Sequence, residues 1–418
     1  MSQEEFTAIV AQYICPVLVG AVVTTVLPRG GRGAPEQVAI RPDGQTMVIG
    51  PAKGAAYQVE IRRSQVFSAD DARLVEAIIT EIVVNFSKIT PPYRARVIKY
   101  AIEVGVCKFL APANFTMLVE VLDGFDSWSR RTYEGRQPTF SIVVDFADKR
   151  APDEHHPAIG EVLAADFAAL LSNSVESALV LSATGALVDY ANFTHDAVAA
   201  NTYAPWRYLA FANHAAKHRV CFTLTANGEV LVFKHQKLFF SKANNGWNYY
   251  NHGSTIAALA GGSLALRKAV YETILDVSFA RTGGCLAVVR QAAVGELIID
   301  EGRGGQSVIK RDDLVANPTS LKSRTISCLI QDRKFQDLDR IVRKEMAGID
   351  GATILTYEGQ ILAVGAIIKI DGGSTGGGRL AATKTLAAHG TAIKVSADGM
   401  VEAFAQDSDG KPMSIFEF

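Results

Sequence analysis

The chain has 418 residues and a formal net charge of −1, with 42 Lys and Arg residues against 43 Asp and Glu residues. Hydrophobic residues make up 48% of the chain and charged residues 20%, which is typical of a globular protein in water. This balance argues against an extended nucleic-acid-binding surface, although it is compatible with a local basic pocket. The length predicts two or three domains.

The cysteines and the apolar segments indicate a location in the cytoplasm. The five cysteines are scattered and include no CxxC pair, which favours reduced thiols over a disulfide framework or a zinc site. The apolar run Ile14–Leu27 contains Pro16 and is shorter than the roughly 20 residues of a membrane span. Glu4 and Glu5 precede it, so it is also a poor signal peptide. We interpret it as a buried strand pair and expect no membrane partner.

The first part of the chain, up to Ser68, has the pattern of β-strands around a Pro-Asp-Gly turn. Ser68 then precedes a helix with acidic residues in its first turn, and apolar helical periodicity continues through residues 93–106. From Thr139 the pattern alternates between strands and helices. The expected strands and hairpins are 140–146, 177–193, 219–233, 284–290, 349–367 and 391–404, and the expected helices are 160–173, 206–218, 266–280, 336–347 and 378–390.

Two parts of this alternating pattern resemble each other. Residues 177–182, SALVLS, overlay residues 351–356, GATILT, at a constant offset that also matches the glycines of the following turns. Glu176 then falls opposite Asp350, and the helices that follow begin near an arginine in both parts. An internal duplication explains these matches, and it predicts two similar lobes.

The expected fold class is therefore α/β (α+β). We expect an N-terminal β-rich segment over residues 1–68, a first lobe with a helical lead-in over residues 69–245, and a second lobe over residues 263–418. Each lobe would be a mixed β-sheet flanked by helices. Residues 244–262 are rich in Asn and Gly and are expected to form a linker.

A glycine run, GGSTGGGRLAATKT (Gly372–Thr385), follows a predicted strand and opens a predicted helix. Glycines allow a phosphate to approach the backbone, and the N-terminus of a helix favours anions. An arginine at the helix start adds a permanent cation that suits phosphate. The residues expected to bind a nucleotide phosphate here are Ser374, Thr375, Gly376, Gly377, Gly378 and Arg379.

Other interpretations of these motifs are open. The run lacks the Gly-Lys-Ser/Thr of a Walker A loop, but Gly372–Gly376 matches GxSxG of serine hydrolases, with His389 as the histidine downstream of it. His214 and His218 have the spacing of a zinc pair on one helical face, and residues 153–156 hold a second cluster of acids and histidines. We interpret the histidines as solvated side chains.

Asp350 begins the strand of the hairpin IDGATILTYEGQILAVGAI, where an apolar residue is expected. An acid at a strand edge beside a phosphate loop can hold a divalent metal or deprotonate a ribose hydroxyl. The alternative is an aspartate that caps a turn.

Taken in order, these motifs resemble those of the diadenylate cyclase (DAC) domain over about the last third of the chain. The early strand Gly283–Arg290, the motif Asp350-Gly351-Ala352 with its hairpin, and the strand Ala392–Phe404 match the family pattern. The resemblance implies that Asp350 coordinates Mg²⁺ or Mn²⁺ and helps to activate the ribose 3′ hydroxyl of ATP. It also implies paired sites that face each other across a dimer, or across an internal pseudo-dimer of the two lobes.

One motif departs from the family. Where diadenylate cyclases carry Arg-His-Arg, this chain has Arg379-Leu380-Ala381, so one cation and one imidazole are missing from the expected triphosphate grip. We therefore expect a divergent, DAC-like bacterial protein that binds ATP or cyclic di-AMP as a sensor through Asp350, Gly351, Ala352 and the glycine loop. The alternatives are an active diadenylate cyclase, in which Lys384 replaces the lost arginine, and an interaction module without a working site.

Overall fold

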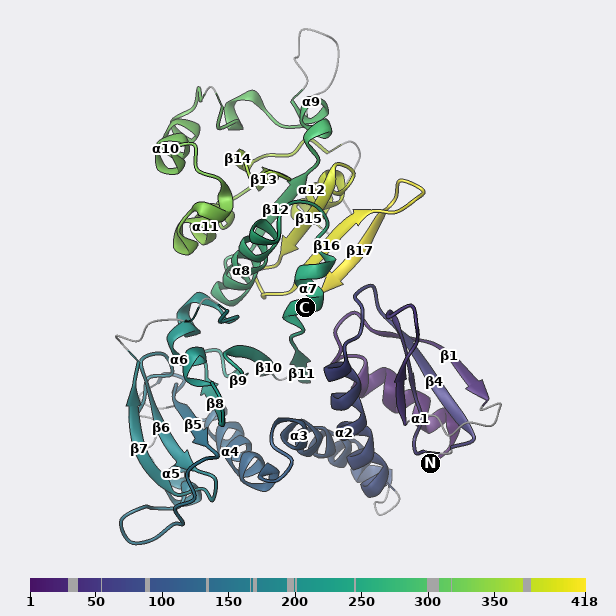
Figure 1. Ribbon diagram of the computed structural model, residues 1–418, viewed down its shortest axis with the longest axis vertical. Coiled ribbons are helices and arrows are strands. Elements are labelled where there is room, and N and C mark those ends of the chain that lie inside the picture. The colour runs from purple at the N-terminus through teal and green to yellow at the C-terminus, as the bar shows by residue number, and fades with distance from the viewer. Residues whose placement is uncertain are drawn as a thin grey trace. The chain divides into compact units, whose positions relative to one another are not determined.

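The chain forms two compact units, Met1–Asn251 and His252–Phe418 (Figure 1). The computed structural model describes residues 1–28, 37–53, 55–86, 91–132, 135–165, 171–193, 201–243, 246–298, 308–316, 318–370 and 377–418, together with residues 167 and 199. The units divide within the segment expected as a linker. This segment nevertheless contains a strand, β11 (Gly246–Tyr249), and a helix, α7 (His252–Ala258).

The first unit begins with a helix where the sequence pattern predicts strands. Helix α1 (Gln3–Ile9) continues as a π-helix over Val10–Ile14. A capping box starts it, because the Ser2 hydroxyl accepts from the backbone N–H of Glu5 while the Glu5 carboxylate accepts from the backbone N–H of Ser2. The interpretation of the apolar run from Ile14 as a strand pair is wrong, since it holds only one strand, β1 (Val22–Pro28).

Four strands of this segment form an antiparallel sheet within the described residues, in the order β1-β4-β3-β2. The strands besides β1 are β2 (Val38–Ile40), β3 (Thr46–Ile49) and β4 (Tyr57–Arg62). Gly44 has a φ of +68° in the turn between β2 and β3, where a side chain would be strained. The expected β-rich character of residues 1–68 therefore applies to residues 22–62.

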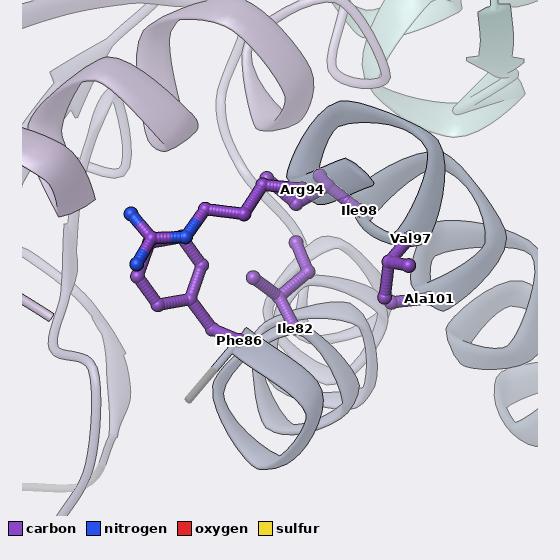
Figure 2. A pocket seen from close by; sticks show the side chains of 6 residues that line it. All are labelled: Ile82, Phe86, Arg94, Val97, Ile98 and Ala101. Carbon is purple, nitrogen blue, oxygen red and sulfur yellow. The ribbon is translucent and has the colours of Figure 1, made fainter. Parts of the chain in front are cut away.

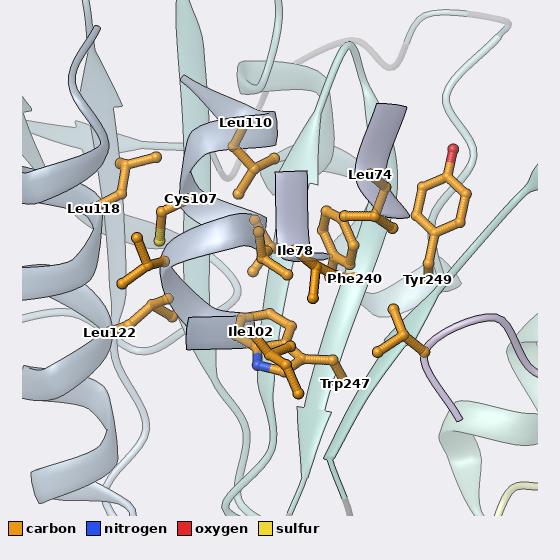
Figure 3. Close-up of a cluster of buried hydrophobic side chains, with 14 of the residues drawn as sticks. Leu74, Ile78, Ile102, Cys107, Leu110, Leu118, Leu122, Phe240, Trp247 and Tyr249 are labelled. Carbon is orange, nitrogen blue, oxygen red and sulfur yellow. The ribbon is translucent and has the colours of Figure 1, made fainter. Parts of the chain in front are cut away.

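Three helices follow: α2 (Ala69–Phe86), α3 (Arg94–Leu110) and α4 (Phe115–Trp128). Their apolar faces pack against one another and against strands of the next sheet. Figure 3 shows the centre of this core, in which Leu74, Ile78 and Ile102 lie near the aromatic rings of β10 and β11. One continuous cluster of buried residues runs from α1 to β11. Division of this unit at residue 68 stays a prediction.

The second sheet of the first unit has seven strands among the described residues, in the order β11-β10-β9-β8-β5-β6-β7. Its helices α5 (Ile159–Ala164) and α6 (Leu209–His214) are shorter than the sequence predicts. The strands, besides β11, are β5 (Ser141–Asp145), β6 (Ser177–Ser182), β7 (Leu187–Asn192), β8 (Arg219–Leu224), β9 (Val230–Lys234) and β10 (Lys237–Ala243).

The second unit is built on a sheet in which the described residues form six strands, in the order β14-β13-β12-β15-β16-β17. The strands are β12 (Gly284–Val289), β13 (Ala352–Thr356), β14 (Ile361–Ala366), β15 (Gly390–Val395), β16 (Val401–Gln406) and β17 (Pro412–Glu417). The helices, besides α7, are α8 (Leu264–Ala280), α9 (Val294–Leu297), α10 (Leu321–Ile330), α11 (Arg340–Ala347) and α12 (Gly378–Ala387).

Helices cover both faces of this sheet (Figure 1). Cys285, Ala287 and Val289 of β12 share a buried cluster with residues of α12, while the intervening Leu286 and Val288 are also buried. Because successive side chains of a strand point to opposite faces, the second set lies on the other face, where α8 and α11 contact β12. The mixed α/β class expected from the sequence is therefore observed.

Six strands of each sheet have the same order and relative directions. β5 pairs in parallel with β6 and antiparallel with β8, as β12 does with β13 and β15. The registers also correspond, because Ser141 lies opposite Thr223 in the first unit just as Cys285 lies opposite Lys394 in the second. This correspondence supports the duplication and extends it from the motifs to whole sheets.

Within the described residues, none of the helices is both long enough and apolar enough to cross a membrane.

Candidate functional site

The described residues of the predicted site meet at one end of the strands of the second unit's sheet, and the topology explains why. The hairpin returns the end of β14 to the start of β13, so that Ala366 pairs with Ala352. The chain that leaves β14 therefore starts beside Asp350, and it leads to α12. β15 is antiparallel to β12 and ends at the same edge, where Val395 pairs with Gly284. Loop, helix start and strand end converge at this point.

Gly351 is required by the backbone geometry of the Asp350 loop. Its φ of +104° is a conformation that side chains disfavour, and a Cβ atom here would lie 2.5 Å from the carbonyl carbon of Gly365. Lys322 fixes the other side of this contact, since its Nζ atom donates to the Gly365 carbonyl at 2.7 Å and to Asp313 at 2.6 Å. The loop is thus closely packed behind Asp350, whose own side chain is 90% exposed.

The N-terminus of α12 is suited to an anion. Its N-cap is Gly377, which has a φ of +90° and forms no side-chain capping hydrogen bond, and its first turn contains no acid. A side chain at Gly378 would meet no described atom within 4 Å. The backbone N–H groups of this first turn, together with the helix dipole, favour negative charge at this position.

Arg379 lies in the first turn of α12 and crosses the space above Gly283. A Cβ atom at Gly283 would lie only 2.5 Å from Nη1 of Arg379, so this glycine makes room for the guanidinium. The Nη2 atom is 3.9 Å from the Asp350 carboxylate. This distance is at the outer limit of an ion pair, and a pair this exposed is weak, so the arginine is available to another anion.

Lys394 is a second cation at this site, and sequence reasoning missed it. In the sequence it is a single charged residue within the apolar strand segment Thr391–Val395. That pattern predicts neither how deeply the side chain is buried nor which residues surround it. In the structure its Nζ atom is 2.5 Å from Glu402 on β16. Lys384, the substitute considered for the missing arginine, instead places its ammonium 5.8 Å from the ring centre of Phe404 and does not line the site.

These groups surround a cavity of about 520 Å³, within the range of small-molecule sites. Asp350, Arg379 and Lys394 supply its charges. The rest of the lining comes from the glycines of the two loops and from a mostly apolar wall. These residues are Cys285, Gly351, Ala352, Ala366, Ile367, Ile368, Ile370, Gly377, Gly378, Leu380 and Ala382. Six of the nine predicted site residues thus line one cavity, while Ser374, Thr375 and Gly376 lie outside the described residues.

The thiol of Cys285 anchors α12 rather than offering a nucleophile. It lies 3.3 Å from the Thr383 hydroxyl, which in turn donates to the Arg379 carbonyl at 2.8 Å. Burial raises the pKa of the Cys285 thiol to about 11, although Thr383 and Arg379 oppose the shift. The thiol therefore stays protonated at neutral pH, and thiolate chemistry is disfavoured.

Glu402 lies directly opposite Glu417 of β17, and from this pairing we expect the stability of the second unit to depend on pH. Burial raises the pKa of Glu417, and the charge of Glu402 adds to the shift. Because the folded-state pKa of Glu417 is raised, its contribution to the free energy of unfolding is fully present at pH values below its unfolded-state pKa. This contribution is lost as the pH rises through the higher folded-state pKa. We expect Glu417→Gln to raise the melting temperature at pH 7 and to have little effect near pH 3. Melting curves across this range test it, and an equal shift at both pH values would contradict it.

The position of the first unit that corresponds to Lys394 holds no cation. Ser141 and Thr223, which match Cys285 and Lys394 in register, share a hydrogen bond of 2.8 Å between their hydroxyl groups. Glu176, opposite Asp350 in the sequence overlay, accepts from the side-chain amide of Asn173 at 2.8 Å. Among the charges of the cavity, Lys394 is thus the one without a charged counterpart in the first unit, because Glu176 and Arg207 fall opposite Asp350 and Arg379 in the sequence overlay.

The structure bears on the alternative motifs as well. Helix α6 ends at His214, so His214 and His218 do not share a helical face as their spacing predicts. His156 and the backbone N–H groups around it donate to Asp153 in a turn. The serine of the GxSxG match lies outside the described residues, and His389 sits beyond the far end of α12 with its Nδ1 atom 3.3 Å from Glu296.

A second hollow, between the ends of α2 and α3, has no room for a ligand. Its lining is apolar apart from Arg94, which lies over the ring of Phe86 at 4.4 Å (Figure 2). The same guanidinium donates to Glu5 at 2.8 Å. The contact between Arg94 and Glu5 joins the N-terminal helix to α3, and the hollow itself has no space for a water molecule.

Comparisons with known proteins add no family to these observations. No protein-family model matches the chain, and no curated protein matches it either. Among the residues that the structure describes, no group of three or more His, Cys, Asp or Glu side chains has the arrangement of a metal site.

Proposed function

We propose that the second unit binds an adenine nucleotide, ATP or cyclic di-AMP, in the cavity between the Asp350 loop and α12, and that the protein acts as a sensor. The single observation that carries the proposal is the convergence of Arg379, Lys394 and the open N-terminus of α12 on one cavity. Cations and helix N-terminal N–H groups are the partners that phosphate prefers. The choice of adenine rests on the resemblance to diadenylate cyclases.

The apolar wall of the cavity supports a nucleotide over a simple anion. Ile367 and Ile368 follow β14, and Leu380 faces the same cavity from α12. Ile367 is 54% exposed although it belongs to the wall, so a ligand's ring would cover apolar surface there. A ligand with a flat apolar ring at one end and a phosphate group at the other fits a cavity that is lined both by an apolar wall and by cations.

Asp350 is suited to a divalent metal that arrives with the nucleotide. Mg²⁺ commonly binds one or two carboxylates together with substrate phosphates. One exposed carboxylate beside two cations fits such shared coordination, and it does not fit a metal held by the protein alone. In this arrangement Asp350 would hold Mg²⁺ or Mn²⁺ against the phosphates and partly neutralise them.

Calorimetric titration of the full chain with ATP and with cyclic di-AMP tests the proposal. We expect Arg379→Gln to weaken binding about 10- to 100-fold, because a hydrogen bond to a charged group contributes about 1.5–3 kcal/mol. The matched control is Arg324→Gln on α10, since Arg324 is exposed and does not line the cavity. If the wild-type chain shows no binding heat and no thermal shift with either nucleotide, the proposed function is wrong.

The enzyme alternative has its own test. Incubation of the protein with ATP and Mg²⁺ or Mn²⁺, followed by nucleotide chromatography, reveals any cyclic di-AMP formed. A sensor binds the nucleotide and leaves it unchanged. Cyclic di-AMP that disappears in Asp350→Asn would show instead that the protein is a diadenylate cyclase.

A further inference from the structure

Lys394 is a partly buried cation in an otherwise apolar strand. It is the one charged residue of β15, a strand whose other side chains are mostly buried. The lysine side chain itself is only 19% exposed. A cation placed so deeply costs free energy unless it is paired.

Glu402 supplies that pairing and holds the ammonium group in place. Its carboxylate is 2.5 Å from Nζ on the neighbouring strand, directly across the pair in register. An ammonium group has three N–H donors. The described contacts give it one side-chain acceptor, Glu402, so donors remain for a ligand in the cavity that Lys394 lines.

The order of charges across the sheet favours a role in ligand binding. From the cavity outward, Lys394 on β15 comes first, then Glu402 on β16 and Glu417 on β17. The lysine therefore stands between the cavity and two carboxylates that would otherwise repel a phosphate. Arg379 reaches the same cavity from α12, so that two cations from separate elements meet there.

We infer that Lys394 is a second phosphate-binding residue, positioned by Glu402, and that together with Arg379 it selects nucleotides with more than one phosphate group. This inference rests on the proposed nucleotide function. One cation suffices for the single phosphate of AMP. ATP and cyclic di-AMP carry further phosphates that engage both cations at once.

The test compares ATP with AMP in calorimetric titrations of the full chain. We expect Lys394→Met to weaken ATP binding at least tenfold and to narrow the preference for ATP over AMP by a similar factor. Lys394→Arg, which keeps the cation, should retain most of the affinity. The matched control is Lys384→Met on α12, because Lys384 contacts Phe404 and lies outside the cavity lining.

The outcomes separate this inference from the proposed function. If Arg379→Gln weakens ATP binding and Lys394→Met does not, the role of Lys394 is overturned while nucleotide binding stands. A purely structural ion pair predicts that Lys394→Met and Glu402→Gln lower the melting temperature and leave ATP affinity unchanged, which also overturns the inference. If the wild-type chain binds neither nucleotide, both proposals fail. Should Lys394→Met not fold, Lys394→Gln, which still donates to Glu402, makes the same comparison.

Discussion

Gly351→Ala is expected to lower the free energy of unfolding of the second unit by about 2–6 kcal/mol, because two costs add together. A residue with a side chain at a φ of +104° is strained by about 1–3 kcal/mol. The added Cβ atom would also lie 2.5 Å from the Gly365 carbonyl carbon, and overpacking of this kind costs about 1–3 kcal/mol. Because Gly365 is backbone held by Lys322, the neighbour cannot simply rotate away.

Urea denaturation followed by circular dichroism measures this effect. Gly295→Ala in α9 is the matched control, since a Cβ atom there meets no described atom within 4 Å and the backbone is unstrained. The control is expected to stay within about 1 kcal/mol of the wild type, and helix propensity favours alanine there. Displacement of the Asp350 loop by Gly351→Ala should also weaken the proposed binding of ATP. A Gly351→Ala protein with wild-type stability would contradict the account of this loop.

Local patterns were enough to predict most of the second unit. Alternating apolar residues and turn glycines identified the hairpin at Gly359 and the strands that flank it. The glycine run predicted a helix start, and α12 begins at Gly378. Asp350 and Arg379 were proposed as one site because their motifs occur in order, and the hairpin geometry brings them to the same edge of the sheet.

What the sequence could not supply is the pairing of distant strands. Lys394 belongs to the cavity because β15 lies beside β12, which places Lys394 opposite Cys285. Strand alternation assigns a residue to a face but not to a neighbour, so this pairing is invisible until the sheet is assembled. Gly283 likewise has a role only because the side chain of Arg379 passes over it.

Two elements were misread for different physical reasons. Ser2 and Glu5 form the capping-box signal of the N-terminal helix. The longer apolar run that follows this helix has a strand-like pattern, and that pattern obscures the helix signal. β11 lies in a segment whose Asn and Gly content is typical of linkers. Trp247 and Tyr249 are nevertheless buried there, and their packing against α3 and β10 outweighs local propensity.

The second large effect concerns Arg340, which joins α11 to α8. Its Nε and Nη2 atoms donate to the Asp276 carboxylate at 2.7 and 2.8 Å, and the side chain of Asp276 is fully buried. We expect Arg340→Met to lower the free energy of unfolding by about 3–5 kcal/mol, because a buried carboxylate loses the guanidinium that neutralises it. Urea denaturation of the full chain measures this loss.

The control and the double variant separate charge from packing. Lys344→Met on the same helix removes a more exposed pair with Glu345 and should cost less than about 1 kcal/mol. Combining Arg340→Met with Asp276→Leu removes both charges from the interior and should recover much of the lost stability. If the double variant is no more stable than Arg340→Met, the shape of the Arg340 side chain, rather than its charge, holds α11 in place. Because α11 leads directly into the Asp350 loop, ATP titration of the same variants would test whether the Arg340–Asp276 pair also positions the proposed nucleotide site.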